Sequence, residues 1–177
     1  MNDFILNTDF HILNFIHANF SCSFLDWLMP KITFLGNYGL IWIAAAIIML
    51  SIQKHRKNGI VLSIGLLCGL IIGNLILKNL IARERPCWIN DSVQLLIGIP
   101  DDYSFPSGHT LSAFVAATVL FSCNKKLGAA AFLLAASIAF SRLYLYVHFP
   151  TDVLCGIIFG VLIGAVVVRL TKPYFNI

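Results

Sequence analysis

The run NGIVLSIGLLCGLIIGNLIL, residues 58–77, contains no charged side chain over 20 consecutive positions. A helix needs about 20 predominantly apolar residues to cross the hydrocarbon core of a lipid bilayer. Three more windows without any charged residue lie on either side of it, at residues 32–53, 127–141 and 153–168. This pattern predicts an integral membrane protein built from helices.

The composition of the whole chain points the same way. Of its 177 residues, 59% are hydrophobic and 11% are charged, about half the charged share of a soluble globular domain. This excludes a disordered chain, a coiled coil and most soluble folds. The formal net charge of +4 is dispersed among the apolar windows and forms no basic patch, so no nucleic-acid partner is expected.

We expect an all-α fold, a polytopic membrane helix bundle that forms a single membrane-embedded domain over residues 1–177. Five clear spans are predicted at residues 32–53, 59–81, 107–123, 127–147 and 153–170. In the N-terminal region, residues 1–36, the segment 4–29 places apolar side chains on one helical stripe with polar ones opposite. It could be an amphipathic helix at the interface or a sixth transmembrane helix. Pro30 and Gly36-Asn37 predict breaks after it.

Basic residues outside the predicted spans set the orientation. They form three clusters: Lys54, Arg56 and Lys57; Lys125 and Lys126; Arg169 and Lys172. Positive charge collects on the cytoplasmic side of a membrane protein, so all three clusters are expected there. The loop at residues 82–106 and the turn at 148–152 then face the periplasm or the exterior of a plasma membrane or bacterial inner membrane.

Glycines recur at intervals of four residues in two of the spans. They are Gly65, Gly69 and Gly73 in the second span and Gly156, Gly160 and Gly164 in the last. Small residues with this spacing let two helices approach closely in lipid. Because they lie in mid-span, away from the polar residues, we predict that they serve packing alone.

Much of the remaining charge falls at the outer ends of four helices. The second span ends near Lys78, with Arg85-Pro86 beyond it; the third begins Pro106-Ser107-Gly108-His109; the fourth ends in Ser141-Arg142, followed by His148 and Asp152. Ionisable residues near a span are costly in lipid and by default mark a functional cavity. Taken singly, each has a structural alternative, such as a hydrogen-bonded buried histidine or a lysine that snorkels to the interface. Their gathering on one face favours a site.

The residue types indicate a phosphate-like ligand. Lys78, Arg85 and Arg142 supply three cations, and the two guanidinium groups suit phosphate oxygens. The helix that begins at Ser107 offers free backbone N–H groups and a positive dipole end, and Gly108 allows a close approach. We therefore expect these five residues to bind phosphate.

Two histidines and one carboxylate complete a hydrolytic set. Asp152 lies within a helical turn of His148 and can accept its ring N–H, which leaves the other nitrogen free as a nucleophile. His109, at the start of the facing helix, could in its protonated form donate a proton to the departing oxygen. The predicted reaction is attack by His148 on phosphorus, followed by hydrolysis of a phosphohistidine.

Three sequence blocks carry these residues: KNLIARERP at 78–86, PSGH at 106–109 and SRLYLYVHFPTD at 141–152. Together they resemble the tripartite signature of the type 2 phosphatidic acid phosphatase superfamily. The resemblance implies a six-helix membrane bundle and hydrolysis of a phosphoester or phosphoanhydride without a metal ion or cofactor. It implies the same roles for the catalytic residues His148, His109 and Asp152, and phosphate binding by Lys78, Arg85, Ser107, Gly108 and Arg142.

The family resemblance also suggests the substrate class. Substrates of the family include phosphatidic acid, phosphatidylglycerol phosphate, lipid A phosphates and polyprenyl diphosphates. The short chain and modest outer loop resemble the small bacterial members that recycle undecaprenyl diphosphate, which is the substrate that we expect. Membrane lipid is a further partner, and no obligatory protein partner is implied.

Two other functions stay open from the sequence. One is a lipid phosphotransferase, in which a lipid or sugar hydroxyl captures the phosphate, and the other is a non-enzymatic anion-binding transporter or scaffold. The outer loop also carries further charged residues, among them Arg83, Asp91, Asp101 and Asp102. The favoured interpretation is a solvated loop, with selection of the head group as the alternative.

Overall fold

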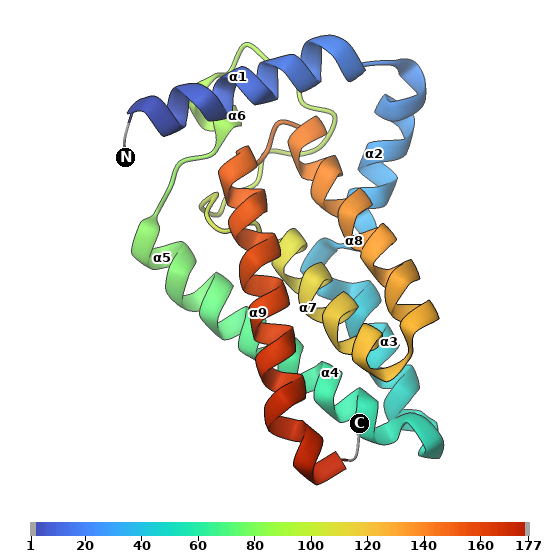
Figure 1. Ribbon diagram of the computed structural model, residues 1–177. Helices are drawn as coiled ribbons and strands as arrows, with labels where there is room; N and C mark the ends of the chain where they lie inside the picture. Colours follow the sequence, from blue (N-terminus) through green and yellow to red (C-terminus); the bar gives the residue numbers. More distant parts are fainter. Residues whose placement is uncertain (1–2, 176–177) are drawn as a thin grey trace.

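The computed structural model describes residues 3–175, and within that range the chain forms helices and loops without a strand (Figure 1). Residues 1–2 and 176–177, which the predicted domain includes, lie outside the described part. The longer helices are α1 (Asp3–Phe20), α2 (Ser23–Leu35), α3 (Leu40–Ser51), α4 (Arg56–Gly69), α7 (Gly108–Cys123), α8 (Lys125–Tyr144) and α9 (Pro150–Phe175). The shorter ones are the 3-10 turns η1 (Asn37–Gly39) and η2 (Gln53–His55), the π-helix η3 (Leu70–Leu77), α5 (Lys78–Ile81) and α6 (Pro86–Ile89).

Three helical segments are long and apolar enough to cross a membrane: Gln53–Ile89, Lys125–Tyr144 and Pro150–Tyr174. α2 and α3 together make a fourth candidate, bent by 43° at the break between them. α7 is apolar but has only 16 residues. The chain is therefore a multi-pass membrane protein, and each predicted span falls on helical structure.

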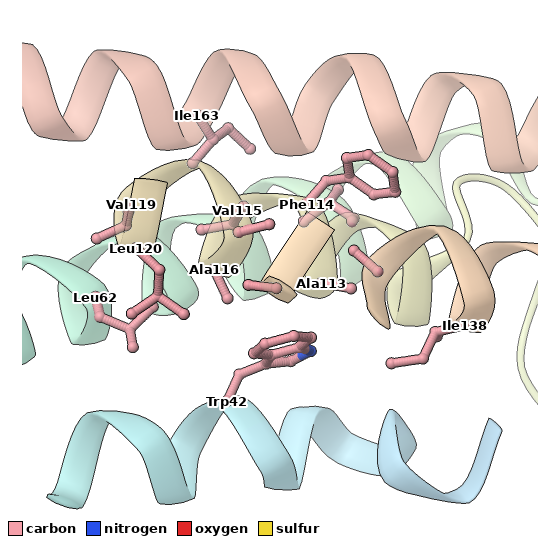
Figure 2. Packing of buried hydrophobic residues seen from close by; sticks show 14 of the residues in the cluster. Trp42, Leu62, Ala113, Phe114, Val115, Ala116, Val119, Leu120, Ile138 and Ile163 are labelled. Atoms are coloured by element: carbon pink, nitrogen blue, oxygen red, sulfur yellow. The ribbon is translucent and has the colours of Figure 1, made fainter. Parts of the chain in front are cut away.

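α7 lies at the centre of the bundle, packed against α4, α8 and α9. Figure 2 shows its buried side chains between residues of four other helices: Trp42 of α3, Leu62 of α4, Ile138 of α8 and Ile163 of α9. A helix that is apolar on most of its faces is typical of such a central position. The first turn of α7, which carries His109, is consequently surrounded by protein.

The glycines predicted to serve packing lie where η3, α4 and α9 meet α7. A Cβ atom at Gly73 would come within 2.7 Å of a methyl carbon of Leu111, and one at Gly160 within 2.7 Å of the Leu111 carbonyl oxygen. Atoms in a close-packed interior do not approach so closely. The packing prediction is confirmed, and it explains how two helices come close to α7 from different sides.

The N-terminal region does not form the single helical stripe predicted over residues 4–29. The chain turns at residues 21–22, so α1 and α2 are separate helices, and α1 lies crosswise over the ends of α8 and α9 (Figure 1). α1 is not among the helices apolar enough to cross a membrane. It buries Asp9, Leu13 and Ile16 against protein, whereas Phe4 and Phe15 of the same helix are exposed.

The break between α2 and α3 occurs at Gly36-Asn37, as predicted, whereas Pro30 stays inside α2. Tyr38 and Gly39 adopt positive φ angles of 53° and 69°, a left-handed conformation that interrupts a helix. The break brings η1 against α7. It thereby adds a polar residue, Asn37, to the surroundings of His109.

Candidate active site

The eight residues predicted for the site gather at one end of the bundle, which we call the site end. They come from consecutive elements: Lys78 opens α5, Arg85 follows it, Ser107, Gly108 and His109 start α7, Arg142 lies in the last turn of α8, His148 follows it, and Asp152 lies in the first turn of α9. The basic clusters near residues 54–57, 125–126 and 169–172 lie at the opposite end (Figure 1). The fold therefore brings together residues up to 74 positions apart in the chain.

A cavity of about 1110 Å³ extends from the site end into the bundle. Six of the eight residues line it: Lys78, Arg85, Gly108, His109, Arg142 and His148. Ser107 and Asp152 do not line it and are fully buried. Farther in, the cavity runs between the α2–α3 pair and the α4–η3 helix, and its walls there are largely apolar: Phe34, Ile43, Ile47, Leu66, Leu67 and Leu70.

His148 is held in the tautomer that leaves Nε2 unprotonated. Nη1 of Arg85 lies 3.0 Å from His148 Nε2, and a guanidinium group can only donate. Burial, and then the charges of Arg85 and other cations of the site, lower the pKa of the His148 imidazole well below its ordinary value of 6.5. The ring is therefore neutral, with a lone pair on the nitrogen that faces the cavity.

The other ring nitrogen of His148 reaches Asp152 through an intermediate. Nδ1 lies 3.3 Å from Oγ of Ser104, and that hydroxyl donates to Asp152 Oδ2 over 2.5 Å. Nδ1 and Oδ2 are themselves 3.8 Å apart, too far for a hydrogen bond. The direct hydrogen bond predicted from the sequence is thus not formed, because the Ser104 hydroxyl bridges the two groups.

Two of the three cations share one carboxylate. Lys78 Nζ and Arg85 Nη2 both bond to Asp102, whose side chain is 51% exposed. Burial alone would raise the pKa of Asp102, but its hydrogen bond with Lys78 and the charge of Arg85 lower it to about 2. The solvated-loop interpretation is therefore wrong for Asp102, which is an ionised partner of Lys78 and Arg85.

The third cation, Arg142, is less completely bonded. Its Nη1 donates to Oγ1 of Thr33 over 2.6 Å. Its Nε is buried and has no hydrogen-bond partner among residues 3–175. A buried guanidinium with a spare donor, in the wall of a cavity, can accommodate an anion.

Two asparagines that the sequence did not single out contact the start of α7. Oδ1 of Asn37 lies 2.9 Å from Nε2 of His109, and an amide oxygen can only accept. A Cβ atom at Gly108 would lie 2.9 Å from Oδ1 of Asn74 in η3. The close approach predicted at Gly108 is therefore made by Asn74.

Arg83 is the second correction to the solvated-loop interpretation. Its guanidinium is buried and forms ion pairs with Asp9 of α1 and Asp152 of α9, at 2.7 and 2.6 Å. It belongs to the wall behind His148 and does not line the cavity. Asp91 is exposed and does not line the cavity, in agreement with a solvated loop, whereas Asp101 is exposed and does line it.

Sequence reasoning missed four polar residues around the site: Asp9, Asn37, Asn74 and Ser104. Asn37 and Asn74 offered a signal, since each is a polar side chain inside a predicted span. Asp9 and Ser104 offered none, because their importance depends on partners that lie far away in the chain. Within residues 3–175, no three His, Cys, Asp or Glu side chains are grouped to hold a metal ion.

Comparisons with known proteins agree with the geometry. The family model of the PAP2 superfamily matches residues 58–175. An undecaprenyl-diphosphatase of Sulfolobus acidocaldarius is 34% identical over 130 residues, which is 72% of this chain and 63% of that protein. The undecaprenyl-diphosphatase BcrC of Bacillus subtilis is 30% identical over 163 residues, 88% of this chain and 81% of that protein. The crystal structure of a PAP2 type phosphatidylglycerolphosphate phosphatase from Bacillus subtilis superposes with a TM-score of 0.79 at 27% identity, over 98% of this chain and 88% of the other.

Proposed function

Because this chain belongs to the PAP2 superfamily, we propose that it is a membrane lipid phosphatase whose substrate is undecaprenyl diphosphate. The observation that carries the proposal is the cavity, which is lined by Lys78, Arg85 and Arg142 at one end and largely by apolar side chains farther in. An anionic head group joined to a hydrocarbon chain would match both parts. A water-soluble phosphate ester would leave the apolar part unfilled.

In the proposed reaction, Nε2 of His148 attacks the terminal phosphorus of the lipid. The N–P bond forms as the P–O bond to the lipid breaks, and protonated His109 gives its proton to the departing oxygen. Lys78, Arg85 and Arg142 hold the phosphate oxygens, together with the backbone N–H group of Gly108. The N–H of Ser107, which was predicted to be free, donates to the Asp152 carbonyl oxygen over 3.2 Å. Arg85, which contacts Nε2 in the unliganded site, turns to the phosphate when the substrate binds.

The second half of the reaction releases inorganic phosphate. Water attacks phosphorus, a new P–O bond forms as the N–P bond to Nε2 of His148 breaks, and His109, now neutral, accepts the proton of that water. The positive charge that develops on the His148 ring is stabilised at Nδ1 by Ser104 and Asp152. With undecaprenyl diphosphate the lipid product is undecaprenyl phosphate, and the reaction as written uses no metal ion or cofactor.

In the membrane, we propose five spans with the site end facing the periplasm or exterior. The spans are the α2–α3 pair, the α4–η3–α5 segment, α7, α8 and α9. The basic clusters at the opposite end support this orientation, since positive charge collects on the cytoplasmic side. α1 lies over the ends of the spans and does not cross the bilayer itself.

Undecaprenyl diphosphate is favoured because two relatives carry the name of that activity. Phosphatidylglycerol phosphate is the main alternative, since the superposed structure is of a phosphatidylglycerolphosphate phosphatase. Phosphatidic acid and lipid A phosphates would fit the same cationic end of the cavity. Transfer of phosphate to a lipid or sugar hydroxyl would use the same first step, whereas a transporter or scaffold would need no nucleophile.

The purified protein in detergent, with EDTA present, should release inorganic phosphate fastest from undecaprenyl diphosphate in a side-by-side assay with phosphatidylglycerol phosphate and phosphatidate. His148→Ala should abolish that release, because it removes the nucleophile. Labelled lipid phosphate should end as free phosphate, and its appearance on an acceptor lipid would indicate a transferase.

The matched control is His11→Ala, which removes an exposed histidine of α1 and should leave activity unchanged. Folding of both variants is compared by size-exclusion chromatography. Phosphate release that survives His148→Ala would overturn the mechanism. Faster release from another lipid would change the proposed substrate but would not contradict the mechanism.

A further inference from the structure

A buried network connects α1 to the first turn of α9. Arg83 donates from Nη2 to Asp9 over 2.7 Å, and from Nη1 to Asp152 and Thr151 over 2.6 and 2.7 Å. Asp9 also accepts from the backbone N–H and the hydroxyl of Thr151. Asp9, Arg83 and Asp152 are each less than 7% exposed, so the three charged members of the network are buried.

The same network meets the loop that carries His148. The Arg83 guanidinium lies 4.0 Å from the centre of the Phe149 ring, next in sequence to His148. Asp152 accepts from the Phe149 backbone N–H over 2.9 Å and from the Ser104 hydroxyl. Both carboxylate oxygens of Asp152 are therefore occupied, one by Arg83 and the other by groups around His148.

None of Asp9, Arg83, Ser104 and Asp152 lines the cavity. Their effect on substrate must therefore pass through another residue, and His148 is the cavity residue that they reach. Two carboxylates against one guanidinium leave this buried group with a net charge of −1, on the Nδ1 side of the ring. A negative charge there favours the positive charge that the ring acquires on attack.

We propose that Asp9 of α1 is a positioning residue for the nucleophile His148. It holds Arg83 in place, and Arg83 in turn orients Asp152. Asp152 then keeps the Ser104 hydroxyl against Nδ1 of the ring. The inference rests on the proposed function, in which Nε2 of His148 attacks phosphorus.

The competing explanation is that the ion pair between Asp9 and Arg83 only attaches α1 to the bundle. We call such a purely structural contact a clip. A clip needs the pair between Asp9 and Arg83, but it does not need Arg83 to share its donors with Asp152. A clip would also act on stability alone. A positioning residue acts on kcat, because the orientation of a reacting group changes the chemical step.

The test uses the full-length protein in detergent and undecaprenyl diphosphate as substrate. Asp9→Asn should lower kcat by about 10-fold to 100-fold, the range for a displaced catalytic group, and leave KM unchanged. Asp3→Asn, which changes an exposed carboxylate on the same helix, should leave both constants unchanged. A rise in KM at constant kcat, or no change in either, would overturn the proposal.

A double-mutant cycle that combines Asp9→Asn with Ser104→Ala tests whether Asp9 acts on His148 through Ser104. Asp9 and Ser104 share no contact, so independent effects on kcat would multiply. If Asp9 acts through Ser104, the double variant should lose little more than Ser104→Ala alone. Ser104→Thr, which keeps the hydroxyl, should restore most of the activity, whereas losses that multiply would contradict the route.

A measurement without substrate separates this inference from the proposed function. The ring ¹⁵N signal of His148 Nδ1, assigned by its loss in His148→Ala, should move in Asp9→Asn and stay in Asp3→Asn. An unmoved signal would overturn the positioning role even if the enzyme is active. If Asp9→Asn does not fold, Thr151→Ala removes one hydrogen bond to the Asp9 carboxylate and should shift the same signal by a smaller amount, and no shift would count against the proposal.

Discussion

Arg83 and Arg85 stand two positions apart, and both are buried, yet their partners differ. Arg83 binds two carboxylates that are themselves buried, Asp9 and Asp152. Arg85 lines the cavity and binds Asp102, which is half exposed. A buried carboxylate that lost its partner would keep an uncompensated charge, whereas Asp102 can turn to water. The exposure of the partner thus distinguishes a structural arginine from one that can receive a ligand.

Among the changes that test this comparison, the largest expected effect on activity comes from Arg85. Arg85→Lys keeps the charge but loses the two-pronged donor, so we expect kcat/KM to fall at least about 100-fold, as for loss of one transition-state donor. Phosphate release measures it. The control is Arg169→Lys, an exposed position at the opposite end of the bundle. Full activity of Arg85→Lys would contradict the proposed role of Arg85 in binding phosphate.

Substitution of Arg83 should lower the free energy of unfolding more than substitution of Arg85 does. Arg83→Met leaves Asp9 and Asp152 buried and unpaired, and breaking such a pair costs about 3–5 kcal/mol in the free energy of unfolding. Arg85→Met also removes the donor to the Asp102 and Val147 carbonyl oxygens, but the one carboxylate that it leaves, Asp102, can be solvated by water, so its loss should be smaller. Thermal unfolding of both variants in one detergent makes the comparison. A greater loss for Arg85→Met would refute the distinction drawn here.

The smallest effect is expected at Asp102. This carboxylate forms ion pairs with Lys78 and Arg85. Its pKa of about 2 keeps it ionised under ordinary assay conditions. Phosphate must compete with it, and a partly exposed ion pair contributes up to about 1 kcal/mol. Asp102→Asn should therefore tighten inhibition by inorganic phosphate up to about fivefold.

The control for this change is Asp91→Asn, an exposed carboxylate elsewhere in the same loop. Inhibition constants for phosphate are measured for both variants and for the wild type. Weaker phosphate inhibition in Asp102→Asn would mean that Asp102 helps to hold the anion, contrary to the comparison with the buried carboxylates.

Much of the fold followed from local patterns along the chain. Charge-free windows located apolar helices, of which three and one bent pair are long enough to cross a membrane in the described part of the chain, and glycines at four-residue intervals identified contacts with α7. These predictions succeeded because hydropathy and side-chain size act over neighbouring residues of one helix. The prediction of one helical stripe over residues 4–29 was wrong, because the chain turns at residues 21–22. The spacing of apolar residues does not indicate such a turn.

The sequence by itself determined which residues are candidates for the chemistry, because Lys78, His109 and His148 are ionisable residues near the ends of apolar spans. Only the tertiary structure decided how they are held. Asp9 and Arg83 are 74 positions apart, and Ser104 and Asp152 are 48 apart. A hydrogen bond depends on distance in space. The type of a residue therefore does not indicate which distant partner the folded helices will bring to it.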